Sequence, residues 1–171
     1  MTINKRRPVM ADKRRVFLGG IVLAMLVIGC LPSFALGQQT SLDLPQQWKF
    51  KKGDDPQWSD SAFDDKDWKT IRVGKPWDRN YDGYGWYRLK LTIPKSWQTD
   101  VSLQKYQHLT LLLGSIDDAD QAWFNSKLVG QTGSLKGENG TANWNRLRVY
   151  RVPASLIRWG KENVIAVRVH D

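Results

Sequence analysis

Trp86-Tyr87-Arg88-Leu89-Lys90-Leu91-Thr92-Ile93 alternates large apolar side chains with polar ones. In an extended chain successive side chains point to opposite faces, so the odd-numbered members, all apolar, share one face, and the polar members share the other. This alternation is typical of an antiparallel strand that is buried on one side. We therefore predict a strand over residues 86–93 with its apolar face in the core and its polar face in solvent.

Short segments of the same kind recur on both sides of this strand, separated by Gly, Asp, Asn and Pro. Strands are expected at residues 48–51, 69–73, 108–115, 121–124, 127–131, 147–152 and 163–170. The leucine-rich segment 108–115 is expected to be more fully buried than the others. Strands of this length and spacing predict an all-β fold, a jelly-roll β-sandwich of about eight antiparallel strands.

The connections carry recognisable turn residues. Asn125-Ser126 is a candidate two-residue hairpin turn, although Asn-Gly would suit a type I′ turn better. The acid-rich residues 57–68 are expected to form a turn or short helix with three aromatic rings pointing inward, and residues 64–67 a solvated turn. Pro153 opens a single helical turn that Gly160 ends.

The first residues have a different composition. Residues 1–15 contain six Lys and Arg against one Asp, and residues 16–31 carry no charge. Sixteen helical residues rise about 24 Å, less than the ~30 Å hydrocarbon core of a bilayer. A basic segment, an apolar segment and the small residues of Ala35-Leu36-Gly37 predict a signal peptide over residues 1–37, with residues 38–171 as the domain.

Val27-Ile28-Gly29-Cys30 also resembles the lipobox of bacterial lipoproteins. In that alternative the leader is residues 1–29 and Cys30 becomes the lipidated N-terminus. Both alternatives predict export, to the periplasm, the medium or a lipid-anchored position at the bacterial cell surface. Contact with a membrane is then expected only through the leader or the lipid anchor.

The charge and the metal-binding residue types exclude several classes of protein. The chain carries a formal +9, but beyond the leader 20 Lys and Arg face 16 Asp and Glu without a basic run, so no nucleic acid partner is expected. One Cys and two His exclude a disulfide framework and a Cys- or His-rich metal site, and no cofactor is expected.

The densest acidic group consists of Asp117, Asp118 and Asp120. Such carboxylates can bind a sugar hydroxyl or a structural calcium ion. Alternatively, they form a turn, in which they accept backbone N–H groups or pair with Arg88 or Arg148. The second alternative is favoured because Asp is a common turn residue.

The nine tryptophans are the main functional signal. Aromatic rings stack on the apolar faces of sugars while nearby polar groups bind the hydroxyls. Six tryptophans are assigned to packing: Trp48, Trp58, Trp68, Trp86, Trp123 and Trp159. The candidate carbohydrate contacts lie in turn-rich loops and are Trp77, Asp78, Asn80, Tyr81, Tyr84 and Trp144.

No catalytic residues are expected in this chain. Glycoside hydrolysis requires two carboxyl groups about 5–10 Å apart across the scissile bond. Glu138 and Glu162 match no catalytic motif, and no G-x-S-x-G sequence is present. His108 and His170 fall at strand ends with no evident nucleophile as partner.

An ordered set of short motifs resembles the sugar-binding domain of glycoside hydrolase family 2, which includes β-galactosidases and β-glucuronidases. The motifs are GDDPQW at 53–58, FDDKDW at 63–68, YDGYGWYR at 81–88, LGSIDDAD at 113–120, WFN at 123–125, VG at 129–130, YRVP at 150–153 and NVIAVRV at 163–169. The resemblance covers residues 46–171 and implies a galactose-binding-like jelly roll. Asn125-Ser126 departs from the family's Asn-Gly turn.

The resemblance implies an exported, non-catalytic carbohydrate-binding module with a glycan as ligand. Family enzymes continue into an immunoglobulin-like sandwich and a TIM barrel that carries both catalytic glutamates, and this sequence contains neither. The alternative is an N-terminal fragment or subunit of a β-galactosidase-like glycosidase, or of a sialate O-acetylesterase-like enzyme, with a catalytic domain as partner. A structural or sensory domain without sugar affinity is a further alternative.

Overall fold

A computed structural model describes residues 41–74, 81–135, 143 and 145–170. The chain divides into two units, Met1–Gln38 and Gln39–Asp171, and all described residues belong to the second. The predicted leader and Cys30 therefore lie outside the described residues. Within the described part, no helix has the length and apolar character needed to cross a membrane.

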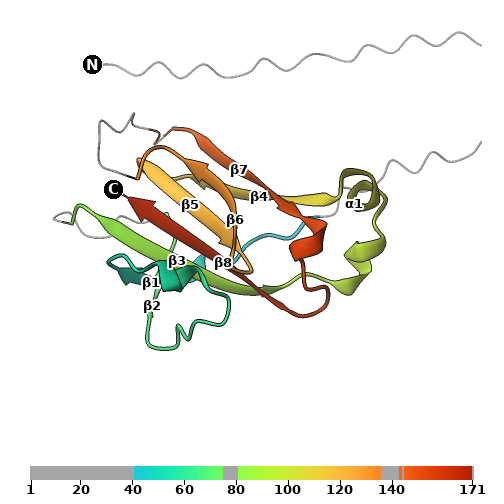
Figure 1. The fold of residues 1–171 in the computed structure, drawn as a ribbon, viewed down its shortest axis with the longest axis horizontal. Helices are drawn as coiled ribbons and strands as arrows, with labels where there is room; N and C mark the ends of the chain where they lie inside the picture. Colours follow the sequence, from blue (N-terminus) through green and yellow to red (C-terminus); the bar gives the residue numbers. More distant parts are fainter. Residues whose placement is uncertain (1–40, 75–80, 136–142, 144, 171) are drawn as a thin grey trace, which may run out of the picture. The chain divides into compact units, whose positions relative to one another are not determined.

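Eight strands form two antiparallel sheets (Figure 1). The larger sheet has the order β2-β1-β3-β8-β5-β6, and the smaller consists of β4 and β7. The strands are β1 (Gln47–Lys52), β2 (Lys69–Arg72), β3 (Tyr84–Thr92), β4 (His108–Ser115), β5 (Ala119–Phe124), β6 (Lys127–Thr132), β7 (Leu147–Pro153) and β8 (Glu162–His170). The predicted all-β sandwich of eight antiparallel strands is confirmed.

In the part of the chain that the structure describes, helical structure is confined to short connections. They are η1 (Pro56–Ser59), η2 (Lys95–Thr99), α1 (Val101–Tyr106) and η3 (Ala154–Leu156). No turn or helix is predicted from the sequence over the residues of η2 and α1. Asp100 begins α1 by accepting the backbone N–H groups of Ser102 and Leu103, and Gln107 ends it in the left-handed conformation.

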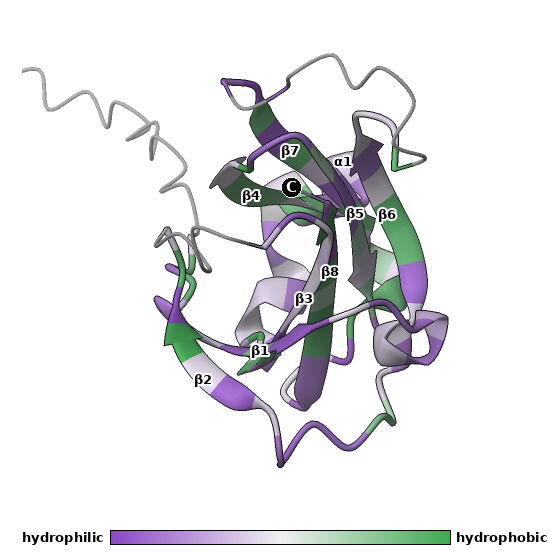
Figure 2. Cartoon of the chain, turned by 90° about the vertical axis from the view of Figure 1, so that its left-hand side faces the viewer, coloured by the Kyte–Doolittle hydropathy of each residue, from purple (hydrophilic) through white to green (hydrophobic). Residues whose placement is uncertain are grey.

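The main core lies between the two sheets. Leu89 and Ile93 of the predicted strand face are buried, and the half-buried Tyr87 and Leu91 pack against the same cluster. The facing sheet contributes Leu111, Tyr150 and Val152, and Figure 2 shows hydrophobic residues along β8 and on β4 and β7. Each fully buried Leu or Ile contributes roughly 1.5–3 kcal/mol to folding.

The opposite face of β3 is also covered, which corrects the prediction that its polar residues face solvent. Arg88 is 0% exposed and Trp86 is 1% exposed. The chain between β1 and β2 folds back over this face and places Trp58 and Trp68 against Trp86. Only Lys90 and Thr92, beyond this cover, are exposed as predicted.

Strand β4 is less buried than predicted. Leu111 is buried, but Leu112 is 64% exposed and pairs across the sheet with the exposed Val149. The reason is that β4 belongs to a two-stranded sheet with only one face on the core. A register shift between Leu112 and Gly114 further interrupts the strand.

The Asn125-Ser126 turn forms with positive φ at both residues, +47° and +67°. These values suit a type I′ hairpin, although Ser stands where Gly is the usual residue. The Ser126 hydroxyl accepts the N–H of Ser61 at 2.7 Å and donates to Asp60 at 3.2 Å. These contacts to the segment between β1 and β2 hold Ser126 in the strained conformation.

Candidate functional site

Two buried arginines, Arg88 and Arg148, each bind a carboxylate and several main-chain carbonyls of the connecting segments. The Arg88 Nε donates to Asp65 at 2.8 Å, and its Nη1 donates to the carbonyls of Trp58 and Asp60. Both members of the Arg88–Asp65 ion pair are buried. The contact ties the segment between β1 and β2 to the outer face of β3.

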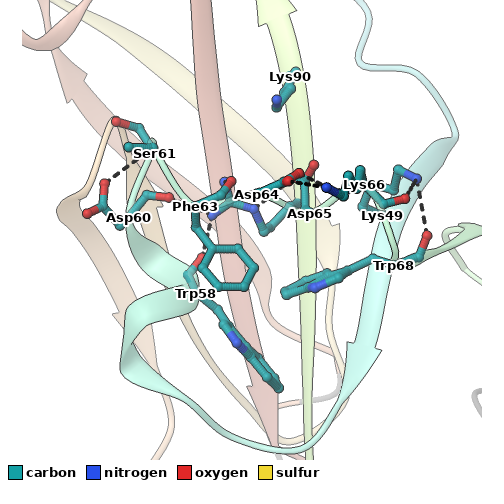
Figure 3. A network of polar contacts seen from close by, with 12 residues as sticks. Lys49, Trp58, Asp60, Ser61, Phe63, Asp64, Asp65, Lys66, Trp68 and Lys90 are labelled. Atoms are coloured by element: carbon teal, nitrogen blue, oxygen red, sulfur yellow. Dashed lines mark hydrogen bonds and ion pairs between the residues drawn. The ribbon is translucent and has the colours of Figure 1, made fainter.

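Asp65 corrects the prediction that residues 64–67 form a fully solvated turn. Its neighbours fit the prediction, because Asp64 is exposed and pairs with Lys66 at 3.1 Å (Figure 3). The N–H of Lys66 lowers the pKa of the Asp64 carboxyl. Figure 3 also shows the rings of Trp58, Phe63 and Trp68 close together beneath this turn.

Asp120 forms the second buried ion pair. Its carboxylate accepts from the Arg148 Nε at 2.6 Å and from the Tyr150 hydroxyl at 2.6 Å. Burial raises the pKa of Tyr150, and the hydrogen bond to Asp120 raises it further, so the hydroxyl remains a donor. The structure thus contains one of the ion pairs predicted for the acidic group, the pair between Asp120 and Arg148.

Of the other two members of the acidic group, Asp118 also contacts Arg148, because its main-chain carbonyl accepts from Nη2 at 3.2 Å. Asp117 is exposed and accepts the N–H of Asp118 at 3.1 Å, and Asp118 adopts a positive φ of 47°. Among the described residues, no three His, Cys, Asp or Glu side chains are placed to hold a metal ion. The geometry at Asp117 and Asp118 is that of a turn.

The structure describes two of the predicted carbohydrate contacts, Tyr81 and Tyr84. Trp77, Asp78, Asn80 and Trp144 lie outside the described residues. The Tyr81 hydroxyl donates to the carbonyl of Tyr84 at 2.9 Å, and the Lys52 ammonium lies 4.4 Å from the Tyr81 ring centre.

Tyr84 is fixed on the outer face of the larger sheet. Its hydroxyl donates to the carbonyl of Leu135, and the Arg168 guanidinium lies 4.3 Å from its ring centre. The His170 ring packs edge-on at 4.6 Å. These contacts build Tyr84 into a packed cluster.

A hollow of about 460 Å³ opens on the inner face of the larger sheet, between the segment before β1 and the end of β4. Trp48 and Tyr87 form its aromatic floor with Val167 and Val169 beside them. The Trp48 indole N–H donates to the carbonyl of Pro45 at 2.8 Å, so this ring offers the hollow only apolar surface. Tyr87 is half-buried and packs at 4.9 Å on Phe50.

The polar groups of the hollow lie at its rim. They belong to Gln46, Ser115 and Asp117, all of which are exposed. Gly74 also lines the hollow and is the last described residue before the sequence that contains Trp77, Asp78 and Asn80. The predicted packing role of Trp48 is confirmed, because this side chain is buried in the main core. The sequence does not point to Tyr87, because inward-facing aromatic residues of a strand are normally core, and it is the incomplete cover by the two-stranded sheet that leaves Tyr87 half-buried at the hollow.

The described residues combine two buried ion pairs with one hollow that is lined mainly by apolar side chains. The two buried carboxylates, Asp65 and Asp120, are each bound to an arginine. A pocket of a few hundred Å³ with an apolar lining and a few polar groups at defined positions is typical of small-molecule sites.

Comparison with known proteins identifies the class. Residues 53–171 match the family model described as the second all-beta domain of beta-galactosidase, and the chain belongs to this family. The relation to glycoside hydrolase family 2 that the motifs predict is confirmed. No curated protein gives a significant match.

Solved glycosidases share the fold. A β-glucuronidase from Bacteroides uniformis is 26% identical with a TM-score of 0.58, and the match covers 73% of this chain and 14% of that one. A glycosyl hydrolase family 2 member from Bacteroides cellulosilyticus is 21% identical, with a TM-score of 0.56 and coverage of 73% and 17%. A Ruminococcus gnavus β-glucuronidase in complex with D-glucuronic acid is 16% identical, with a TM-score of 0.52 and coverage of 73% and 20%. The chain thus spans at most a fifth of the length of these enzymes.

Proposed function

We propose that this chain is a non-catalytic carbohydrate-binding domain that serves a family 2 glycoside hydrolase. The observation that carries the proposal is the hollow, with aromatic residues on its floor and polar side chains at its rim. The family relation supports a sugar as the ligand. Trp77, Asp78 and Asn80, which follow the rim residue Gly74 in sequence, are proposed as further sugar contacts.

Titration calorimetry of the purified chain against galactosides, glucuronides and polysaccharides tests this proposal. We expect at least one of them to bind with a Kd below the millimolar range. Ser115→Ala should weaken binding several-fold, because it removes a hydroxyl at the rim of the hollow. Thr110→Ala is the matched control, since it removes an exposed hydroxyl from the same strand away from the hollow. No response to any sugar would refute carbohydrate binding.

A second candidate function is that of a piece of a longer glycosidase. The observation that favours it is the length of the match, because the chain covers only 14% to 20% of the length of the similar enzymes. Coding sequence for an immunoglobulin-like domain and a barrel downstream of Asp171 would support it, and unrelated sequence there would argue against it.

A third candidate is a structural or sensory domain that binds a partner but has no affinity for sugars. Such a domain would still bind its partner after Trp77→Ala and Trp144→Ala.

We propose that the chain is exported through its N-terminal leader. Mass spectrometry of the protein from a bacterial host distinguishes the two processing routes: a chain that begins at Gln38, or a lipidated Cys30. Cys30→Ala should abolish membrane association only in the second route. A chain that retains Met1 and stays in the cytoplasm would contradict both.

A further inference from the structure

We propose that the hollow binds the apolar aglycone of an aryl or alkyl glycoside, while the sugar stays at the polar rim. This inference rests on the proposed carbohydrate binding and adds the chemical class of the ligand. It follows from the different chemistry of the rim and the interior of the hollow.

The lining offers few partners to hydroxyl groups. Most of its side chains are aliphatic, and its two aromatic rings belong to Trp48 and Tyr87, of which only Tyr87 carries a hydroxyl. The indole N–H of Trp48 is already used by the carbonyl of Pro45. A sugar ring lowered into this space would lose water from several hydroxyls and gain few hydrogen bonds in return, which opposes binding. An apolar group has no hydrogen bonds to water to lose, and its burial in the hollow removes apolar surface from water.

The size of the hollow suits such a group. Its volume is about 460 Å³, whereas an apolar protein cavity of about 150 Å³ is large enough to hold benzene. An aromatic ring therefore has room on the floor beside Tyr87, and the glycosidic oxygen can remain near the mouth.

The walls of the hollow are apolar side chains that a ligand would cover. Leu113 and Ile116 are half-buried and pack against the core between the sheets. Both line the hollow at the end of β4, next to the rim residues Ser115 and Asp117. A ligand with one apolar end and one hydroxylated end matches both halves of this surface at once.

Calorimetry with three probes tests the inference: 4-nitrophenyl β-D-galactopyranoside, methyl β-D-galactopyranoside and 4-nitrophenol. We expect the nitrophenyl glycoside to bind at least tenfold more tightly than the methyl glycoside, and more tightly than nitrophenol. Glucopyranoside and glucuronide pairs repeat the comparison for other sugar heads.

Leu113→Ser should reduce this advantage several-fold, because the half-buried Leu113 side chain lines the hollow. Leu128→Ser on β6 is the matched control, with a leucine that is 53% exposed and lies outside the hollow. Equal affinity of the nitrophenyl and methyl glycosides would overturn the inference and leave carbohydrate binding intact. An unchanged advantage in Leu113→Ser, in a variant whose circular dichroism matches that of the unchanged chain, would also overturn it. No binding of any glycoside would overturn both proposals, as would nitrophenol binding as tightly as its glycosides.

Discussion

Arg88 is the residue on which the cover of the outer sheet face depends. Its guanidinium reaches Asp65 and three main-chain carbonyls of the segment between β1 and β2. Removing one partner of a buried pair leaves the other charge without compensation, which typically costs about 3–5 kcal/mol. We expect Arg88→Ala to lower the free energy of unfolding by an amount of this order, measured by urea denaturation.

Lys90→Ala is the control for Arg88→Ala. Lys90 lies two residues further along the same strand face, but it is exposed and 3.7 Å from Glu162. Exposed ion pairs contribute about 0–1 kcal/mol. Equal losses in the two variants would show that the Arg88 contacts do not stabilise the fold.

Asp54 gives the stability a dependence on pH. Burial raises the pKa of its carboxyl, but hydrogen bonds from Arg168 and Trp86 outweigh this effect and leave the pKa below its usual value. A carboxyl with a lowered pKa stabilises the fold above its unfolded-state pKa of about 3.9, and this contribution is lost as the pH falls through the folded-state value.

Asp54→Asn should therefore cost about 1 kcal/mol of unfolding free energy at pH 7, because the pair with Arg168 is partly exposed. The difference from the unchanged chain should shrink below pH 4, where the unchanged chain loses the same contribution. Urea denaturation at pH 7, 4 and 3 measures it. A difference that stays constant over this range would contradict the assignment.

At the scale of elements, alternation in the sequence predicts the strands well and their surroundings less well. Each predicted strand forms, and the inward face of β3 is the predicted one. Whether the other face meets solvent depends on distant residues, and here residues 56–68 cover it. Sequence periodicity reports which residues share a face, but it does not report what lies against that face.

Strand β4 differs from its prediction in the opposite direction, because it is more exposed than its sequence suggests. Its run of leucines predicts a strand more fully buried than the others, but β4 and β7 form a sheet with one face on the core. We expect Leu111→Ala to cost about 2–5 kcal/mol of unfolding free energy, as buried leucines do. Val149→Thr on the exposed face should change it by less than about 0.5 kcal/mol.

Thermal denaturation of both variants checks this prediction. Val149→Thr keeps a β-branched side chain, so the strand propensity is retained and only the exposed face changes. A large loss of stability in Val149→Thr would mean that the exposed face of β4 and β7 is covered in solution.

At the scale of the whole molecule, the candidate site could be predicted only in part. The motifs lead to the family, and loop aromatics lead to Tyr81 and Tyr84, both of which are held by contacts within the domain. The hollow arises because a two-stranded sheet lies against a six-stranded one and leaves Tyr87 half-buried beside the buried Trp48. No local pattern reports this mismatch, since it depends on how many strands each sheet contains.

The same topology makes the last strand essential to the fold. β8 lies between β3 and β5 and is paired with both along most of its length, so it joins two halves of the larger sheet that are distant in sequence. It also supplies Ile165, Val167 and Val169 to the core and Ala166 to the outer cluster. Deleting residues 162–171 should therefore abolish cooperative unfolding, because two internal strands become unpaired edges and both clusters lose members.

Deleting residues 1–40 should leave cooperative unfolding intact, because the two sheets are built from residues 47–170. Circular dichroism and tryptophan fluorescence during urea denaturation distinguish the two deletions. A sigmoidal transition that both probes report at the same urea concentration is expected only for the chain that retains β8. Such a transition in the chain without β8 would mean that the remaining strands close the core in another way, and that β8 is not what unites the sheet.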